Sequence, residues 1–214
     1  MLSSPPEMPA RKRSPASVRA SLRVLRWKSC TPRFALSRAT FRLTPAGVKP
    51  RRRAVNSAGV FATGVVGAPD ADLQQFERQI DVNIKGVVTA VRQAAPLLSD
   101  NGRIVSIGTT GATRIAFPGM ADYVASKAAV AAYTRGWSRD LGARGITVNV
   151  VQPGAINTEM NPQDSAFADT LRAMTSLGRY GQPEEIAGAV SFLEGPDTRY
   201  ITGATPNVDG GQIA

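Results

Sequence analysis

Along this chain, short apolar runs alternate with longer stretches of helical pattern. Residues 102–108 and 146–151 are short apolar runs, which are typical of β-strands buried on both faces of a sheet. Helices are expected around these runs, at 73–80, from near Val82 through Leu98, at 124–141 and from Pro183 onward. The alternation of strands and helices predicts an α/β fold with a parallel sheet.

Charge divides the chain near residue 54. Residues 1–53 contain 14 Lys or Arg and a single acid, Glu7, which amounts to a formal charge of +13. Residues 54–214 contain 12 basic and 15 acidic residues, a formal charge of −3. The whole-chain value of +10 is therefore misleading, and we divide the chain into a basic segment, 1–53, and one domain, 54–214.

Four interpretations of the basic segment stay open. Its basic runs could bind nucleic acid, its Arg-rich and acid-poor composition resembles a transit peptide, and its polarity is compatible with a natural disordered extension. The favoured interpretation is a non-native stretch, from a frame error or a misplaced start, before the true frame resumes near Ala54. Scattered prolines and the lack of apolar periodicity predict that the segment lies outside the packed domain and that trypsin removes it.

Tyr123 and Lys127 carry the most chemical information in the chain. They lie four positions apart where the predicted helix begins, so on a helix they would share one face. A fixed cation beside a phenol favours the phenolate and moves tyrosine toward acid–base chemistry at neutral pH. Such pairs are also common on solvated helix faces, so the surrounding motifs decide between a site and an ordinary surface pair.

Each apolar run is followed directly by residues that could bind a ligand. Thr109 and Thr110 come directly after the first run, and the turn Pro153-Gly154-Ala155-Ile156-Asn157-Thr158 follows the second one. Because sites in open α/β sheets lie at the carboxyl ends of the strands, both places are candidates for a ligand site.

Together, these motifs resemble those of the short-chain dehydrogenase/reductase family. Tyr123 and Lys127 match its YxxxK motif downstream of a strand ending in Ser or Thr, and residues 153–158 match its PGxIxT turn. Residues 56–59 resemble its NNAG turn, and residues 81–86 resemble its helix with a structural and catalytic asparagine. The resemblance covers the whole domain defined above and implies an incomplete Rossmann-like, doubly wound parallel sheet with helices on both faces.

The resemblance implies hydride transfer between NAD or NADP and a small carbonyl or alcohol substrate. Tyr123 would donate or accept the substrate proton, while Lys127 would lower the pKa of Tyr123 and hold the nicotinamide ribose. Thr109, or Thr110 by a shift of one residue, would replace the family's serine and hydrogen-bond the carbonyl; alignment of the strand favours Thr109. Asn83 would hold a water that links Lys127 to solvent.

The resemblance also assigns residues to the cofactor and to the surface of the domain. The adenine-ribose side would be lined by Asn56, Ala58 and Gly59, and the nicotinamide side by Pro153, Gly154, Ile156 and Thr158. Residues 160–179 are polar and irregular, as in a mobile substrate lid. Residues 200–203 and 208–211 are similar to the family's closing strand and tail. A homo-oligomer, either a dimer or a tetramer, is implied as well.

A glycine-rich turn is missing from the sequence before Asn56. A dinucleotide-binding half needs a first strand, such a turn and crossover helices, which at roughly 30 residues or more per βαβ unit exceeds the space available. We therefore expect weak cofactor binding, because the pyrophosphate loses its helix N-terminus. The alternative function is a non-catalytic remnant that acts through oligomer or partner binding.

Composition excludes several other kinds of chemistry. The chain has no histidine, which excludes a Ser-His-Asp triad and an HExxH zinc site. Cys30 is the single cysteine, so we expect no disulfide within the chain, no metal site and a cytoplasmic location. No apolar run approaches the roughly 18 residues of a transmembrane helix. Neither a membrane nor a nucleic acid is expected as a partner of the domain.

Overall fold

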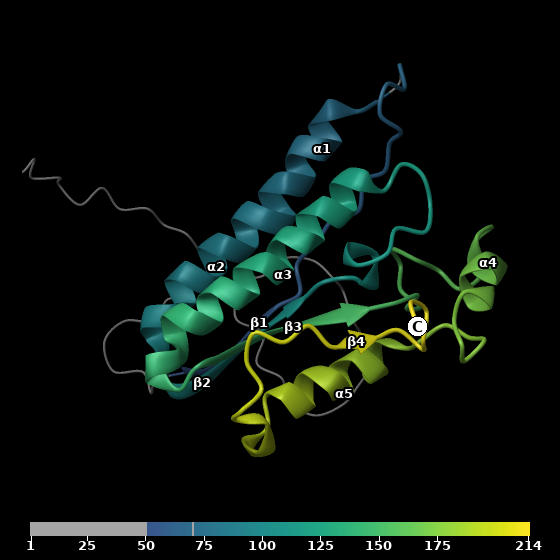
Figure 1. Ribbon diagram of the computed structural model, residues 1–214. Helices are drawn as coiled ribbons and strands as arrows, with labels where there is room; N and C mark the ends of the chain where they lie inside the picture. The colour runs from purple at the N-terminus through teal and green to yellow at the C-terminus, as the bar shows by residue number, and fades with distance from the viewer. Residues whose placement is uncertain (1–50, 70) are drawn as a thin grey trace, which may run out of the picture.

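The computed structural model describes residues 51–69 and 71–214, which form a parallel sheet with helices on both faces (Figure 1). The predictions for residues 1–50 lie outside this part of the chain. The described strands pair in the order β1-β2-β3-β4, and every pair is parallel. Their bounds are Arg51–Asn56 (β1), Leu98–Ile107 (β2), Thr147–Pro153 (β3) and Asn207–Val208 (β4). The α/β fold class is confirmed.

The helices follow the predicted pattern, with differences at their ends. Their bounds are Leu73–Ile80 (α1), Val87–Ala94 (α2), Ala121–Leu141 (α3), Ala168–Ala173 (α4) and Pro183–Leu193 (α5). A π-helical turn, Asp81–Gly86, joins α1 to α2, and a 3-10 turn, Ala95–Leu97, follows α2. Three further 3-10 turns occupy Thr110–Ala112, Gly142–Arg144 and Pro196–Thr198.

The two predicted helices between 73 and 98 are one continuous helical path. The bounds of the first helix, 73–80, are confirmed, but the chain passes into the second through the π-helical turn without a loop. No proline lies between residue 73 and Pro96, so nothing in the sequence removes a helical N–H donor there. The predicted end at Leu98 is wrong by one residue, because Leu98 already begins β2.

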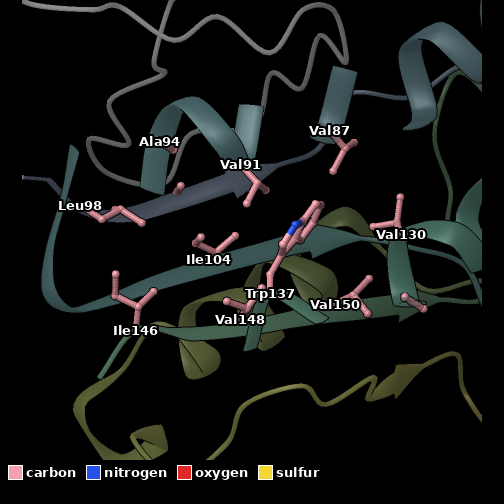
Figure 2. Packing of buried hydrophobic residues seen from close by; sticks show 12 residues of the cluster. Val87, Val91, Ala94, Leu98, Ile104, Val130, Trp137, Ile146, Val148 and Val150 are labelled. Atoms are coloured by element: carbon pink, nitrogen blue, oxygen red, sulfur yellow. The ribbon is translucent and has the colours of Figure 1, made fainter. Parts of the chain in front are cut away.

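One core cluster lies between the sheet and the helices α2 and α3. Trp137 of α3 packs with Val91 of α2 and with Ile104 and Val148 of the sheet, as Figure 2 shows. On the opposite face, α5 covers the sheet through Leu193, which packs against Val105 and Val151. Neighbouring residues of β2 therefore serve opposite faces, which confirms that this strand is buried on both sides.

The first strand extends across the predicted division at residue 54, and the last strand lies elsewhere than expected. β1 begins at Arg51, so this strand includes the last three residues of the basic segment. The closing strand is β4, not residues 200–203. Gly203 has a left-handed backbone with φ of 69°, which interrupts an extended strand there. Gly203 N–H still donates to the carbonyl of Val148 at 2.7 Å, so this stretch runs along the edge of β3.

The carboxyl ends of the three longer strands lie at one edge of the sheet, because the strands are parallel. The loops that leave β1, β2 and β3 therefore meet at this edge, and the first turn of α3 faces it. This edge is where the sequence predicts a site. Within the described residues, no helix combines the length and the apolar character needed to cross a bilayer.

Candidate active site

Tyr123 lies in the first turn of α3, between the loops that follow β1 and β2. Its side chain is hydrogen-bonded to the side chain of Thr109. The ring of Phe61 meets the ring of Tyr123 edge to face, with 4.8 Å between the ring centroids and 82° between the planes. Burial raises the pKa of Tyr123 to about 12, although the hydrogen bond with Thr109 acts to lower it. The phenol is therefore a neutral proton donor at neutral pH.

Lys127 follows one helical turn later and is 6% exposed. Its Nζ donates a hydrogen bond to the carbonyl of Ile107 at 3.0 Å. Burial lowers the pKa of Lys127 to about 8, because the charged form is desolvated. The predicted lowering of the Tyr123 pKa by Lys127 is wrong for this structure, since burial of the phenol dominates and raises that pKa.

The two candidate threonines have different surroundings. Thr109 Oγ1 accepts a hydrogen bond from Gly111 N–H at 3.3 Å and lies beside Tyr123. Thr110 is 2% exposed, and its hydroxyl donates to the carbonyl of Pro153 at 3.2 Å. The Thr110 hydroxyl therefore joins two loops, whereas Thr109 lies beside the phenol of Tyr123. Thr109 is also the residue that alignment of the strand favours for the position of the family's serine.

Asn83 lies in the π-helical turn and is fully buried. Its Oδ1 accepts from Val60 N–H at 2.9 Å, and its Nδ2 donates to the Val60 carbonyl at 2.9 Å and to Ser126 Oγ at 3.0 Å. Both amide donors of Asn83 are thus engaged, and the second lone pair of Oδ1 is left for another donor. The water-holding role of Asn83 stays a prediction. Its hydrogen bonds to Val60 also anchor the loop after β1 to the π-helical turn.

Gly59 lies next to both Asn83 and Lys127. A Cβ atom at Gly59 would be 3.1 Å from Lys127 Nζ and 3.5 Å from Asn83 Oδ1. A side chain at this position would therefore push against the ammonium group. The neighbouring Ala58 is half-buried in the same loop. These contacts bring the predicted Asn-Ser-Ala-Gly turn to the helix face that carries Lys127.

Asn56 ends β1 and is 3% exposed. Its Nδ2 donates to Ser106 Oγ of β2 at 3.1 Å, while its Oδ1 is buried without a hydrogen-bond partner among the described residues. The side chain of Asn56 therefore joins β1 to β2 rather than facing solvent. Its predicted place on the adenine-ribose side stays a prediction.

The turn after β3 is held against the C-terminal tail. Pro153 ends the strand, and a Cβ atom at Gly154 would lie 2.8 Å from the Cα of Asp209, so the close approach requires glycine. Ile156 forms an isolated parallel bridge with Gly181, and Thr158 forms an antiparallel bridge with Asn161. The predicted nicotinamide-side residues therefore form one ordered loop at the carboxyl end of β3.

The segment 160–179 is less irregular than the sequence suggests, because it contains α4. Ala168 of this helix is buried with Ala155 and Tyr180, and Leu171 packs against them. The guanidinium of Arg172 lies over the Tyr180 ring, 5.5 Å from its centroid. This small apolar cluster explains why a helix forms within a largely polar stretch.

Two residues of this region, Phe61 beside Tyr123 and Gln79 beside the loop after β1, were not predicted from the sequence. Phe61 contacts the Tyr123 ring, as described above, and Gln79 of α1 is fully buried. The Oε1 atom of Gln79 accepts a hydrogen bond from Ala62 N–H at 2.7 Å. The sequence feature that could have identified Gln79 is its spacing from Asn83. Gln79 lies four positions before Asn83 and therefore on the same helix face. Within residues 51–69 and 71–214, no three His, Cys, Asp or Glu side chains gather to hold a metal.

Comparison with known proteins places these features in a family context. A family model described as Enoyl-(Acyl carrier protein) reductase matches residues 52–212. The 3-oxoacyl-[acyl-carrier-protein] reductase of Synechocystis sp. is 40% identical over 162 residues, which cover 74% of this chain and 64% of that protein. The cyclic-di-GMP-binding biofilm dispersal mediator protein of Escherichia coli is 41% identical over 157 residues, which cover 73% of this chain and 65% of that protein.

A solved structure has a similar fold over most of this chain. The crystal structure of a blue fluorescent protein from a metagenomic library, in complex with NADPH, has a TM-score of 0.74 and 46% sequence identity. The match covers 77% of this chain and 66% of that chain. The chain thus spans just under two thirds of the length of the two curated relatives.

Proposed function

Because the chain belongs to the short-chain dehydrogenase/reductase family, we propose that it is an NAD(P)-dependent oxidoreductase acting on a small carbonyl or alcohol substrate. The observation that carries this proposal is the contact of Tyr123 with Thr109, one helical turn from the buried Lys127. These three side chains come from two elements and converge at the carboxyl edge of the sheet.

The nicotinamide-ribose end of the cofactor would lie against the residues at this edge. Lys127 has three N–H donors and uses one on the Ile107 carbonyl, so two are available for ribose hydroxyls. Gly59 leaves room for the Lys127 ammonium group beside it, and Pro153 and Ile156 would add apolar contacts. When bound, the cofactor supplies or accepts the hydride that no amino-acid side chain can provide.

The phosphate end of the cofactor has no counterpart in the described residues. A glycine-rich turn that opens a helix is the usual cradle for a pyrophosphate. The glycines at 59, 64 and 67 belong to the loop after β1, and α1 begins only at Leu73. This supports the proposal that the 214-residue chain binds the cofactor weakly.

The protein's own part in the reaction is proton transfer and orientation. With a pKa of about 12, the Tyr123 phenol holds its proton at neutral pH and would donate it to a substrate oxygen during carbonyl reduction. The Thr109 hydroxyl, hydrogen-bonded to the phenol, would bind the same oxygen and orient it. Lys127 would supply positive charge at the point where the alkoxide develops.

A non-catalytic role is the second candidate, and one comparison favours it. The Escherichia coli relative bears a name for cyclic-di-GMP binding rather than for catalysis. In this role the chain would bind a nucleotide or a protein partner without turnover. The intact contacts of Tyr123, Thr109 and Lys127 favour the oxidoreductase, because simple binding does not require a positioned proton donor.

The cellular setting is also part of the proposal. We place the protein in the cytoplasm as a homo-oligomer, either a dimer or a tetramer. The homo-oligomer is supported by an exposed aromatic residue of α3, Tyr133, which is 40% exposed and whose ring stacks on Trp137. Sedimentation of the purified chain measures the oligomeric state directly.

Assay of the full chain tests the proposed activity. NADPH oxidation is followed with a panel of ketones at saturating cofactor, and the variant Tyr123→Phe serves as the comparison. Turnover that disappears in Tyr123→Phe supports the oxidoreductase. Equal background in both proteins, together with binding of cyclic-di-GMP but not NADPH, would favour the non-catalytic role.

A further inference from the structure

The loop that leaves β1 is held by one helical path rather than by a neighbouring strand. Asn83 pairs with both backbone groups of Val60, as a strand partner would, at 2.9 Å for each hydrogen bond. Gln79, one turn earlier on the same helix face, accepts from Ala62 N–H at 2.7 Å. Two side-chain amides therefore hold alternate residues of the loop.

Gly64, the next alternate residue of the loop, is also held in place. A Cβ atom at Gly64 would lie 2.6 Å from the ring of Phe76 in α1, so the loop packs directly on that ring. Gly64 N–H also donates to the carbonyl of Gly119 at 2.9 Å, which ties the loop to the segment before α3. Held positions at 60, 62 and 64 leave the residue at 61 free to turn its side chain toward Tyr123.

Phe61 depends on this backbone clamp for its position. Its side chain is 42% exposed, so burial in a core does not hold the ring in place. The ring nevertheless meets the Tyr123 ring edge to face at 4.8 Å. An exposed aromatic ring keeps one such geometry only if its backbone is held, and the amides of Gln79 and Asn83 hold it on both sides.

Holding the loop through Gln79 leaves one buried atom of its side chain unpaired within the part of the chain that the structure describes. Its Nε2 is buried without a hydrogen-bond partner among the described residues, while its Oε1 binds Ala62. A buried polar atom without a partner destabilises the fold by roughly 1–3 kcal/mol. An apolar residue would avoid this cost, but it could not accept the Ala62 N–H.

We propose that Gln79 is a positioning residue for Tyr123: it holds Ala62 so that the Phe61 ring stays against the phenol and excludes water from it. This inference rests on the proposed function, in which Tyr123 is the proton donor. The charged group on the same face of α3 is Lys127, whereas the loop residues facing the phenol, Phe61 and Thr109, are uncharged.

The experiment measures ionisation of Tyr123 in the full chain without cofactor. Tyrosinate absorbance is recorded against pH, and the curve of Tyr123→Phe is subtracted so that only Tyr123 contributes. Gln79→Met removes the acceptor at similar volume, and Phe61→Leu removes the ring. Gln93→Met is the matched control, because Gln93 is an exposed glutamine of α2.

In the unmodified chain, Tyr123 should titrate near its raised pKa of about 12. In Gln79→Met and Phe61→Leu, water should reach the phenol and raise its ionisation constant about tenfold. Gln93→Met should titrate like the unmodified chain. An unchanged curve in either test variant, or an equal change in Gln93→Met, would overturn the proposal.

A second measurement decides the question if Gln79→Met does not fold. Hydrogen exchange of the Ala62 amide in the unmodified chain should be slow, because Gln79 holds it, and fast exchange would overturn the proposal. Neither readout needs turnover. A shifted titration without any oxidoreductase activity would therefore remove the proposed function alone, and an active enzyme with an unshifted titration would remove this inference alone.

Discussion

Lys127 Nζ donates a hydrogen bond to the backbone carbonyl of Ile107 at 3.0 Å, which ties α3 to the last residue of β2. The carbonyl is neutral, so it compensates only part of the cost of burying an ammonium group that is 6% exposed. The lowered pKa of Lys127, about 8, is the consequence. This contact holds a titrating cation one helical turn after Tyr123 and makes the stability of the protein depend on pH.

The free energy of unfolding should rise with pH from about 8 toward about 10. Lys127 has a pKa of about 8 when folded and an ordinary value of about 10.4 when unfolded. Between these values the unfolded state binds more protons, so raising the pH favours the folded state. Urea denaturation across this range measures the effect.

Two lysine variants test whether Lys127 causes the rise of stability with pH. Lys127→Met should flatten the rise, whereas Lys85→Met should keep it, because the Lys85 side chain is 71% exposed. At still higher pH, the raised pKa of Tyr123 acts in the opposite sense and stability should fall as the pH passes from about 10 to about 12. A rise that persists in Lys127→Met would contradict the assignment.

Replacing Tyr123 by Phe should lower turnover by about 10² to 10⁴-fold, because it removes the positioned proton donor. Phenylalanine keeps the ring that meets Phe61, so folding should change little, and cofactor affinity should be similar. Steady-state kinetics and NADPH binding of the same preparation check both parts. Near-normal turnover across a panel of ketones and alcohols would show that Tyr123 has another role.

The 214-residue chain should bind NADPH weakly, because the described residues lack a glycine-rich cradle for the pyrophosphate. Fluorescence or calorimetric titration of the full chain measures this. A Kd in the low micromolar range would contradict the prediction and show that another part of the chain holds the phosphates.

Gly154→Ala should destabilise the domain by about 1–3 kcal/mol, because the added methyl group would lie 2.8 Å from the Asp209 backbone. Gly188→Ala in α5 is the matched control, since a Cβ atom there meets nothing within 4 Å. That change should stabilise the helix by roughly 0.5–1 kcal/mol. Chemical denaturation measures the free energy of unfolding of both variants. Equal changes in the two variants would show that Asp209 moves aside and that the close contact does not require glycine.

The sequence by itself determined the local features of this protein. The turn before residue 73 placed the first helix at 73–80, and two short apolar runs indicated the two strands that are buried on both faces. The sequence also placed Tyr123 and Lys127 on one helix face, and the order of the motifs indicated the family. These features depend on residues close together along the chain, so their spacing alone carries the information.

Only the tertiary structure decided what depends on contacts between distant residues. It supplied the contacts behind the preference for Thr109 over Thr110, since Thr109 meets Tyr123 and Thr110 meets Pro153 across the loops. It reversed the expected direction of the Tyr123 pKa, because desolvation arises from neighbours that no local spacing reveals. It also showed Gln79 holding a loop 17 positions away. Burial and hydrogen-bond partners arise when separate segments pack together, and a one-dimensional pattern does not specify that packing.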